Sequence, residues 1–412
     1  MARPVSERSI LFLVGAVQFV NILDFMMVMP LGPDFAKALG IPAAHLGVIG
    51  GSYTASAAVA GVVGARFLDR FDRKKALAVA MAGLVLGTAL GGLAQGLYSL
   101  VAARIVAGAF GGPATSVAMS IIADVVPPER RGKAMGAVMG AFSVASVLGV
   151  PAGLELARIG GWQLPFFAVA GLGVVVAGAG IWLLPSLRMH LDAGPVQRVD
   201  VFQLLQRPEV FLSLGATTAL MLSNFLVVPN LSAFLQFNLG YPRESMGVLY
   251  MVGGVISFGV MRLCGMLVDR IGSPAVALIG STLMIGDLVT GILRTPPMIP
   301  VMFFFVTFMV AGSFRGVAIN TQSSRVPGPS ERAGFMSTQS AVQHLSAAAG
   351  AFLSSQLLTE GANHQLVGMP RVIWLSIGIS ILLPVFLFMV ARRLARRIPS
   401  AEAPTLAVSG GS

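Results

Sequence analysis

Charged residues and cysteine are both scarce in this chain. Only 11% of its 412 residues are charged, and Cys264 is the single cysteine, so no disulfide can form within the chain. Soluble domains carry roughly 25% charged residues, which this protein does not approach. The sequence also lacks a P-loop, a metal-spaced cluster of cysteine and histidine, and a nucleophile elbow. These absences argue against an enzyme and against ATP-driven transport by this chain alone.

Long apolar runs take the place of the missing charge. Hydrophobic residues make up 55% of the chain, and the mean hydropathy is +0.83. Apolar runs of about 20 residues, the length that crosses a hydrocarbon core of about 30 Å, recur from end to end. The sequence therefore predicts an all-α integral membrane protein with twelve transmembrane helices, at residues 9–31, 45–66, 76–95, 99–122, 135–157, 164–184, 210–238, 246–267, 274–293, 298–322, 334–358 and 371–392.

Similar motifs occur at the same places in the two halves of the chain. "VAGAFGG" at 106–112 matches "VAGSFRG" at 310–316, and "VPPERRGKAM" at 126–135 matches "VPGPSERAGFM" at 326–336. Such internal repeats are typical of transporters. We therefore expect two pseudo-symmetric six-helix bundles at 1–184 and 210–398, a cytoplasmic linker at 185–209 and a disordered tail at 399–412.

The net charge of +11 is distributed unevenly among the junctions. Twenty of the 28 lysines and arginines lie in junctions on the side of the N-terminus, and five lie on the opposite side. The positive-inside rule then places both termini in the cytoplasm, and we expect the bacterial cytoplasmic (inner) membrane. Because the charges are dispersed among loops, we expect no nucleic-acid partner.

Two charged junctions carry related residues after the second span of each half. "GARFLDRFDRKK" at 64–75 contains Asp69, Arg70 and Arg73, and "GMLVDRIG" at 265–272 contains Asp269 and Arg270. Both resemble the pattern G-x-x-x-D-R-x-G-x-(R/K)-(R/K) of the major facilitator superfamily. The resemblance extends over nearly the whole chain and implies that these residues form a cytoplasmic gate. The alternative is that the charges only fix the topology.

The fifth span contains a second pattern similar to this family. Gly149, Pro151 and Gly153 lie in "GVPAG" and predict a kinked, smooth helix face. The pattern resembles the fifth-helix motif of antiporters, most closely in the bacterial twelve-helix drug or sugar efflux branch that includes arabinose-efflux-like permeases. Ordinary glycine-mediated packing is the alternative.

An acid and an arginine lie at similar depths within the membrane. Asp24 in the first span lies roughly 10 Å from one membrane face and Arg104 in the fourth span about 8 Å from it, at about 1.5 Å of rise per residue. "RIVAG" at 104–108 is similar to the family pattern R-x-x-Q-G, with Ala107 in place of glutamine. A carboxylate beside an arginine can exchange a proton as its surroundings change. We expect proton coupling by this pair, with a permanent structural ion pair as the alternative.

Further polar side chains lie in the spans that line the central cavity in the resembled family. Each of them alone is more often a helix–helix contact than a ligand contact. As a group they are our candidates for binding substrate: Gln18, Asn21, Asn224, Asn230, Arg315, Asn320, Gln339 and Gln343.

Taken with the resemblance, the sequence favours a secondary active transporter that exports drug-like molecules, sugars or metabolites by proton antiport with alternating access. The alternatives are a uniporter, a lipid or lysolipid flippase, and a non-transporting membrane sensor. We expect no cofactor, because a proton gradient supplies the energy. The expected partners are the lipid bilayer, protons and a small-molecule substrate, and we expect a monomer.

Overall fold

The computed structural model describes residues 6–64, 68–188, 201–294, 297–328 and 331–397. The N-terminal half contributes α1 (Glu7–Val28), α3 (Leu46–Gly64), α4 (Arg73–Gly92), α5 (Leu97–Val125), a fifth span made of α6 (Pro128–Val144), η3 (Ala145–Gly149) and α7 (Val150–Gly160), and α8 (Gln163–Leu183). The C-terminal half contributes α11 (Pro208–Ala233) with η4 (Phe234–Asn238), α12 (Met246–Ile271), α13 (Ser273–Leu288) with η6 (Val289–Leu293), α14 (Val301–Ser324), α15 (Arg332–Leu357) and α16 (Met369–Arg397).

The described residues therefore form twelve long helical spans, six in each half, at the places that the sequence predicts. In this part of the chain eleven of the spans are both long enough and apolar enough to cross a membrane. The remaining one, α15, is rich in serine, glutamine and alanine and packs against both α3 and α11. Its low hydropathy follows from this position between two other helices. The predicted all-α membrane fold is confirmed.

Short elements connect the spans. They are α2 (Gly32–Leu39), η1 (Ala43–His45), η2 (Leu68–Arg70), α10 (Val201–Leu205), η5 (Arg243–Ser245), β1 (Thr359–Glu360), η7 (Ala362–His364) and β2 (Leu366–Val367). The two strands pair antiparallel, with Thr359 opposite Val367 and Glu360 opposite Leu366. The sequence analysis did not predict this small hairpin between α15 and α16.

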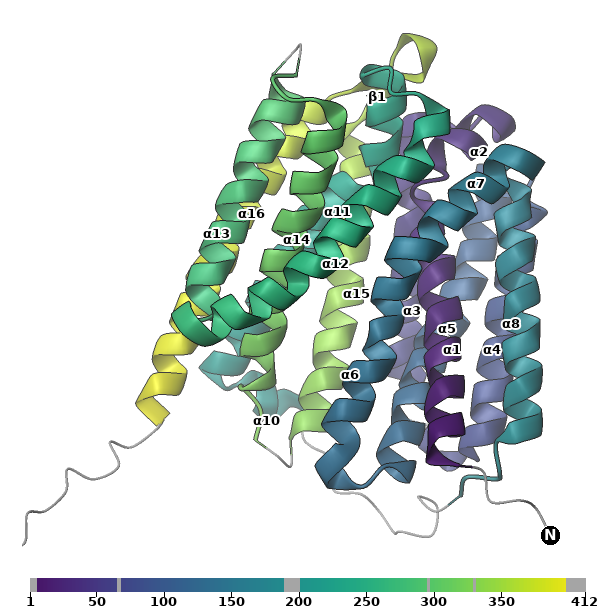
Figure 1. The fold of residues 1–412 in the computed structure, drawn as a ribbon, viewed down its shortest axis with the longest axis vertical. Helices are drawn as coiled ribbons and strands as arrows, with labels where there is room; N and C mark the ends of the chain where they lie inside the picture. Colours follow the sequence, from purple (N-terminus) through teal and green to yellow (C-terminus); the bar gives the residue numbers. More distant parts are fainter. Residues whose placement is uncertain (1–5, 65–67, 189–200, 295–296, 329–330, 398–412) are drawn as a thin grey trace, which may run out of the picture.

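The bundle has two ends that differ in what they carry. The first residues of α1 and the last residues of α16 both lie at the lower end in Figure 1, which we call the terminal end. Helix α2 and strand β1 lie at the opposite end, which we call the distal end. An even number of spans brings the start and the finish of the described chain to the same end.

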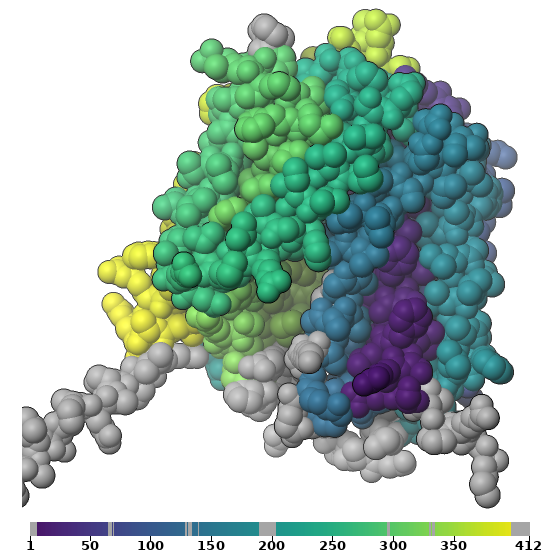
Figure 2. Space-filling model, viewed as in Figure 1, coloured from purple at the N-terminus to yellow at the C-terminus, as the bar shows by residue number. Residues whose placement is uncertain are grey.

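Glycine allows the two halves to approach closely near the distal end. Gly47 and Gly51 of α3 face Ala351 of α15, and a Cβ atom on Gly47 would collide with the Ala351 carbonyl oxygen. On the other side of the bundle, a Cβ atom on Gly254 of α12 would lie 3.2 Å from the Ser146 carbonyl oxygen of η3. Figure 2 shows α12, in green, lying directly against the blue fifth span in its upper part.

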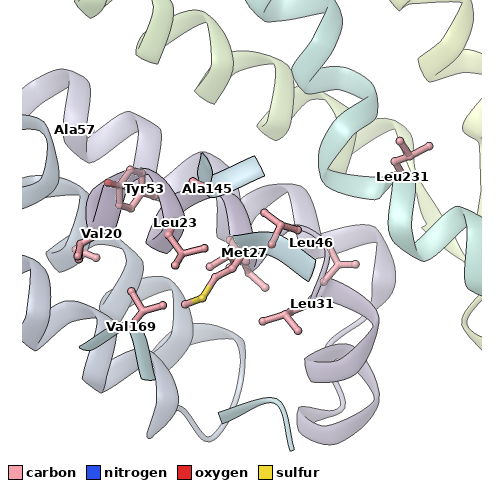
Figure 3. Close-up of a cluster of buried hydrophobic side chains, with 14 of the residues drawn as sticks. Val20, Leu23, Met27, Leu31, Leu46, Tyr53, Ala57, Ala145, Val169 and Leu231 are labelled. Atoms are coloured by element: carbon pink, nitrogen blue, oxygen red, sulfur yellow. The ribbon is translucent and has the colours of Figure 1, made fainter. Parts of the chain in front are cut away.

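The fifth span changes its helical pitch where the sequence places proline. Pro151 has no N–H to donate to the preceding turn, and its ring crowds that turn. The five residues before Val150 form a π-helical turn, η3, as often occurs where the regular ladder is interrupted. The turn lies against α1 in the hydrophobic core, where Ala145 is grouped with Leu23 and Met27 (Figure 3).

Candidate functional site

A buried ion pair joins the first and fourth spans. Arg104 of α5 donates from Nη1 to Asp24 Oδ1 and from Nη2 to Asp24 Oδ2, both at 3.0 Å. Relative exposure of the side chains is 1% for Arg104 and 0% for Asp24. A bidentate arginine–carboxylate pair is among the stronger hydrogen-bonded contacts in proteins. The two residues that the sequence places at similar depths are therefore in direct contact.

A hydroxyl group from a third helix completes the environment of the carboxylate. Thr88 of α4 donates to Asp24 Oδ1 at 2.7 Å, and its oxygen also lies 2.9 Å from the Leu84 carbonyl oxygen. The single hydroxyl proton can serve either acceptor. If Asp24 gains a proton, the Thr88 hydroxyl can donate to the Leu84 carbonyl instead. A change in the charge of Asp24 therefore does not leave this hydroxyl without a hydrogen bond.

Tyr53 and Asn21 support the arginine from the other side. The guanidinium carbon of Arg104 lies 4.6 Å from the ring centroid of Tyr53 in α3, a cation–π contact. The Tyr53 hydroxyl donates to Asn21 Oδ1 at 2.7 Å, and Asn21 Nδ2 donates to the Gly111 carbonyl at 3.0 Å and to Thr115 Oγ1 at 2.6 Å. Asn21 thus ties α1 to α3 and α5 and holds the aromatic ring beneath the guanidinium.

The network can couple a proton to a change in helix packing. Arg104 Nε is buried without a hydrogen-bond partner, so the attraction of the guanidinium to α1 depends on the two bonds to Asp24 and a longer one to its backbone carbonyl. Protonating Asp24 would remove one of two opposite buried charges, and an unpaired buried charge is costly. The pair therefore favours rearrangement, or the entry of another anion or water, whenever Asp24 becomes neutral.

Arg315 occupies the interior of the C-terminal half without an acidic partner. It is fully buried in α14. Its hydrogen bonds go to neutral groups: Asn224 Oδ1 at 2.8 Å, Ser223 Oγ at 2.7 Å and Ser380 Oγ at 3.2 Å. Among the described residues no carboxylate forms an ion pair with it. Among the described residues the two halves therefore differ, since the buried arginine of the N-terminal half pairs with a carboxylate and that of the C-terminal half does not.

Two of the other five predicted substrate residues form hydrogen bonds with a neighbouring helix. Asn230 donates to Ser354 at 2.5 Å and Gln339 to Thr217 at 3.4 Å. Gln18 is buried and its Oε1 has no partner. Gln343 is half-buried and Asn320 is exposed. The amides of Gln18, Asn320 and Gln343 are the ones of this set for which the structure shows no hydrogen bond with the described protein.

The predicted gate residues form no ion pair between the halves among the described side chains. Arg73 pairs with Asp124 of α5 at 3.1 Å, within the N-terminal half. Arg70, Asp269 and Arg270 are exposed at the terminal end. The side chain of Asp69 lies outside the described residues. The gate therefore stays a prediction, and in this conformation the described inter-half contacts lie elsewhere.

Asp72 holds the beginning of α4 in place. Its carboxylate accepts from the backbone N–H of Lys74 at 2.9 Å, from the Leu187 N–H at 3.2 Å, from Ser186 Oγ at 2.5 Å and from Arg188 Nε at 3.3 Å. Burial raises the pKa of Asp72, but these hydrogen bonds outweigh it and lower the pKa to about 2. Asp72 occupies a glycine position of the family pattern, and helix capping explains why aspartate fits there.

Polar contacts join the two halves at the distal end. Arg243, at the start of η5, pairs with Asp34 of α2 at 2.7 Å and donates to the Leu154 carbonyl of α7 at 3.1 Å. Glu360 of β1 accepts from the Ala43 N–H at 2.8 Å. We call the contacts of Arg243 with Asp34 and Leu154 the distal latch. They hold the halves together at the end opposite the termini.

The fifth-span motif packs against α1. A Cβ atom on Gly149 would lie 2.6 Å from Leu23 Cδ1, and one on Gly153 would lie 3.7 Å from Met27 Cβ. A larger residue at Gly149 would therefore have to displace the end of the Leu23 side chain, next to Asp24. Pro151 contributes the interruption described above. Whether the motif is an antiporter element stays a prediction.

The sequence analysis missed Thr88 and Tyr53. Threonine and tyrosine are common in membrane helices, and neither residue stands out from its apolar neighbours. Both lie within the predicted spans, but only the rotation of each helix about its axis brings them to the ion pair. The spacing of Tyr53 from the glycines of α3 is the one signal in the sequence that could have indicated an inward position for its side chain.

The architecture defines a multi-pass membrane protein built from two pseudo-symmetric helical bundles, an arrangement characteristic of secondary transporters. The family model of the Major Facilitator Superfamily matches residues 14–351. The chain belongs to this family, and its relatives include a chloramphenicol resistance protein and a purine ribonucleoside efflux pump.

The relatives are distant in sequence and close in fold. The chain is 25% identical over 345 residues to the chloramphenicol resistance protein of Streptomyces lividans, covering 83% of this chain and 87% of that protein. It is 28% identical over 264 residues to the purine ribonucleoside efflux pump NepI of Escherichia coli O6:K15:H31, covering 62% of this chain and 64% of that pump.

A solved structure shares the whole fold. It is the crystal structure of a bacterial homolog of the human lysosomal transporter Spinster, in an inward-facing and unoccupied conformation. The TM-score is 0.73 at 16% identity, and the match covers 96% of this chain and 99% of that one. At this identity the likeness concerns the fold alone.

Proposed function

We propose that this protein exports a small molecule across the membrane in exchange for protons, with Asp24 as the proton-carrying group and Arg104 as its partner. The observation that carries the proposal is the fully buried, bidentate Asp24–Arg104 pair. Purely structural ion pairs in membrane interiors are rare because burying a charge there is expensive. The efflux relatives support the direction of transport.

In the proposed cycle, the charge on Asp24 decides how firmly α1 and α5 are held together. When a proton from the outside binds Asp24, Arg104 loses its charge-assisted partner. The helices of the N-terminal half then shift, and the two halves rock about the central site. Release of the proton to the cytoplasm restores the pair. Tyr53 keeps the guanidinium in place throughout, since a cation–π contact does not depend on the protonation of Asp24.

The proposed orientation places the terminal end in the cytoplasm. The excess of lysine and arginine on that side of the sequence supports it through the positive-inside rule. The distal latch would then close the outer face, so that this conformation faces inward. A topology reporter fused after residue 397 tests the orientation, and activity of an extracytoplasmic reporter at that position would contradict it.

The proposed cargo is a drug-like or nucleoside-like molecule. The names of the relatives above support these two classes. The free amides of Gln18, Asn320 and Gln343 could hydrogen-bond uncharged polar groups of such a molecule. Radiolabelled chloramphenicol and a radiolabelled purine ribonucleoside are the first probes to use.

The proposal is tested with everted membrane vesicles energised by a pH gradient. Wild type should accumulate a probe in response to the gradient. Asp24→Asn should lose this accumulation and keep binding and exchange of the same probe, because asparagine imitates the protonated acid but cannot release a proton. Glu7→Gln is the matched control: it removes an acid from the same helix, at the terminal end, and should transport normally.

Two outcomes would contradict the proposal. If Asp24→Asn retains full gradient-driven accumulation, Asp24 is not the proton carrier. If wild type equilibrates the probe without responding to the gradient, the protein is a uniporter. In both comparisons the amount of protein in the membrane is measured, so that a loss of abundance is not counted as a loss of coupling.

A further inference from the structure

A second acid is buried in the C-terminal half, away from the ion pair. Asp287 lies near the end of α13 and is 6% exposed. Its Oδ1 contacts the Thr307 hydroxyl of α14, and its Oδ2 is buried without a hydrogen-bond partner. Within the described part of the chain no lysine, arginine or histidine pairs with it. An isolated ionised carboxylate in such a place would bear a large desolvation cost.

The isolation of Asp287 favours a proton on the acid, and Thr307 can accommodate it. The Thr307 oxygen lies 2.9 Å from the carbonyl oxygens of both Phe303 and Phe304. Its hydroxyl can donate to an ionised Asp287, as Thr88 does to Asp24, or it can donate to the backbone and accept from a protonated Asp287. Because Asp287 has no cationic partner among the described residues and its Oδ2 has no donor, the protonated form avoids the cost of an isolated buried charge.

The internal repeat places this acid at the counterpart of the Asp24 site. α4 begins at residue 73 and α13 at residue 273, so Asp287 corresponds to Gly87, the neighbour of Thr88. The matching motifs at 106–112 and 310–316 place Thr307 opposite Ala103, the neighbour of Arg104. Both halves thus have an acid and a threonine at this level, on different helices. In the C-terminal half the acid is on the helix that corresponds to α4, the threonine is on the helix that corresponds to α5, and the position that corresponds to Arg104 is Phe308.

The charged groups on the surrounding elements leave the acid isolated. Arg315 of α14 lies two turns farther from the distal end and bonds to Ser223, Asn224 and Ser380. The other ionisable side chains on the surrounding elements lie elsewhere. Cys264 is buried in α12, and the remaining five are exposed: Arg262, Asp269, Arg270, Arg294 and Arg371. The π-helical turn η6 follows Asp287 immediately and leads to the distal end, and such turns often occur at functional sites.

From this geometry we infer that Asp287 is a second proton-binding site of the transporter, occupied when the distal end is closed. The inference rests on the proposed antiport, to which it adds a second titrating group. In the opposite conformation, water that reaches Asp287 past η6 takes the proton from the carboxyl oxygen and leaves a solvated carboxylate. The proton is rebound before the distal end closes, because the closed site cannot solvate the charge.

Infrared spectroscopy of the purified full-length protein tests the protonation directly. A protonated carboxylic acid has a C=O stretching band that a carboxylate lacks. Wild type at neutral pH should show this band, Asp287→Asn should lose it, and Asp24→Asn should retain it. If Asp287→Asn has the same band intensity as wild type, Asp287 is ionised and the inference fails. This readout does not depend on any transported probe.

A second variant tests the assigned hydrogen bond and does not remove the acid. Thr307→Val keeps the shape of the side chain but removes the acceptor of the Asp287 proton, so the band should persist and move to higher frequency. Ser281→Ala removes another buried hydroxyl of α13 and should leave the band unchanged. A band that does not move in Thr307→Val would overturn the assigned hydrogen bond and, with it, the argument for a proton on Asp287.

Proton counting tests whether the proton of Asp287 is exchanged at one end only. Because Asp287 releases and rebinds its proton at the distal end, Asp287→Asn should carry as many protons per chloramphenicol as wild type in proteoliposomes and remain driven by the gradient through Asp24. A lower proton count in Asp287→Asn would overturn this exchange at one end and leave the proposed antiport intact. Loss of coupling in Asp24→Asn concerns the proposed function only, so the two failures can be told apart.

Discussion

Breaking the distal latch should shift the equilibrium between the two conformations. Arg243→Gln removes the charge that pairs with Asp34 and also weakens the bond to the Leu154 carbonyl. The side chains of Arg243 and Asp34 are 20% and 23% exposed, so the pair lies between an exposed salt bridge, worth about 0–1 kcal/mol, and a protected charged hydrogen bond, worth about 1.5–3 kcal/mol. We take about 1–2 kcal/mol for the latch.

That energy corresponds to a roughly 5- to 30-fold change in the ratio of the two conformations, since about 1.4 kcal/mol is a factor of ten. The change is visible only if the latch acts differently in the two states. It does so in this structure, because Arg243 belongs to the C-terminal half and both of its partners belong to the N-terminal half. The distally open population should therefore increase by that factor.

The assay measures distances between spin labels across the distal end. Cys264→Ala provides a background without cysteine, and labels are attached at Ala38→Cys and Val367→Cys, both exposed and on opposite halves. Arg243→Gln should shift the distance distribution toward longer values. Arg371→Gln is the matched control, because Arg371 lies at the start of α16, is exposed and forms no ion pair among the described residues. An unchanged distribution in folded Arg243→Gln would refute the reasoning.

Two further predictions concern the N-terminal half. Arg104→Met should lower the unfolding temperature more than the double variant Asp24→Leu with Arg104→Met. The reason is that the single change leaves a buried carboxylate unpaired, at a cost of about 3–5 kcal/mol. Additive effects of the two changes in a thermal unfolding series would contradict this. Asp72→Asn should be less stable than wild type at neutral pH, and the difference in stability should shrink as the pH falls from about 4 toward about 2. The lowered pKa of Asp72 stabilises the folded state only while the carboxylate is ionised. A stability difference that does not vary with pH would contradict the assigned hydrogen bonds.

The spans were predictable because their signal is local. Eleven of the spans are long enough and apolar enough by themselves to cross a bilayer, and their limits are marked by charge, proline or glycine. Most ends were therefore predictable to within a few residues, although the fifth span begins at Pro128, seven residues before its predicted start at 135. The relation between Asp24 and Arg104 was also accessible, because depth in the membrane depends only on distance along each helix. The capping role of Asp72 agrees with turn chemistry, since aspartate both caps a helix and tolerates a tight turn.

The remaining features depend on how helices are rotated and packed. Whether Thr88 faces Asp24 or lipid depends on the rotation of α4 about its axis. The nearly uniform apolar sequence of that helix does not indicate this rotation. The distal latch joins Arg243 to Asp34 across 209 positions of the chain, and its formation depends on which end of the bundle is closed. The same reason explains why the described gate side chains at the terminal end form no ion pair between the halves here.

The polarity of α15 bears on how the protein enters the membrane. A segment is inserted efficiently by the translocation machinery when its own transfer free energy is favourable, and α15 is the one described span that is not apolar enough by itself. Its serines and glutamines become acceptable in the bilayer only when α3 and α11 cover them. Insertion of the eleventh span is therefore tied to helices synthesised earlier, including one from the first half of the chain. Helix α3 of the N-terminal half thus forms part of the surface on which α15 assembles.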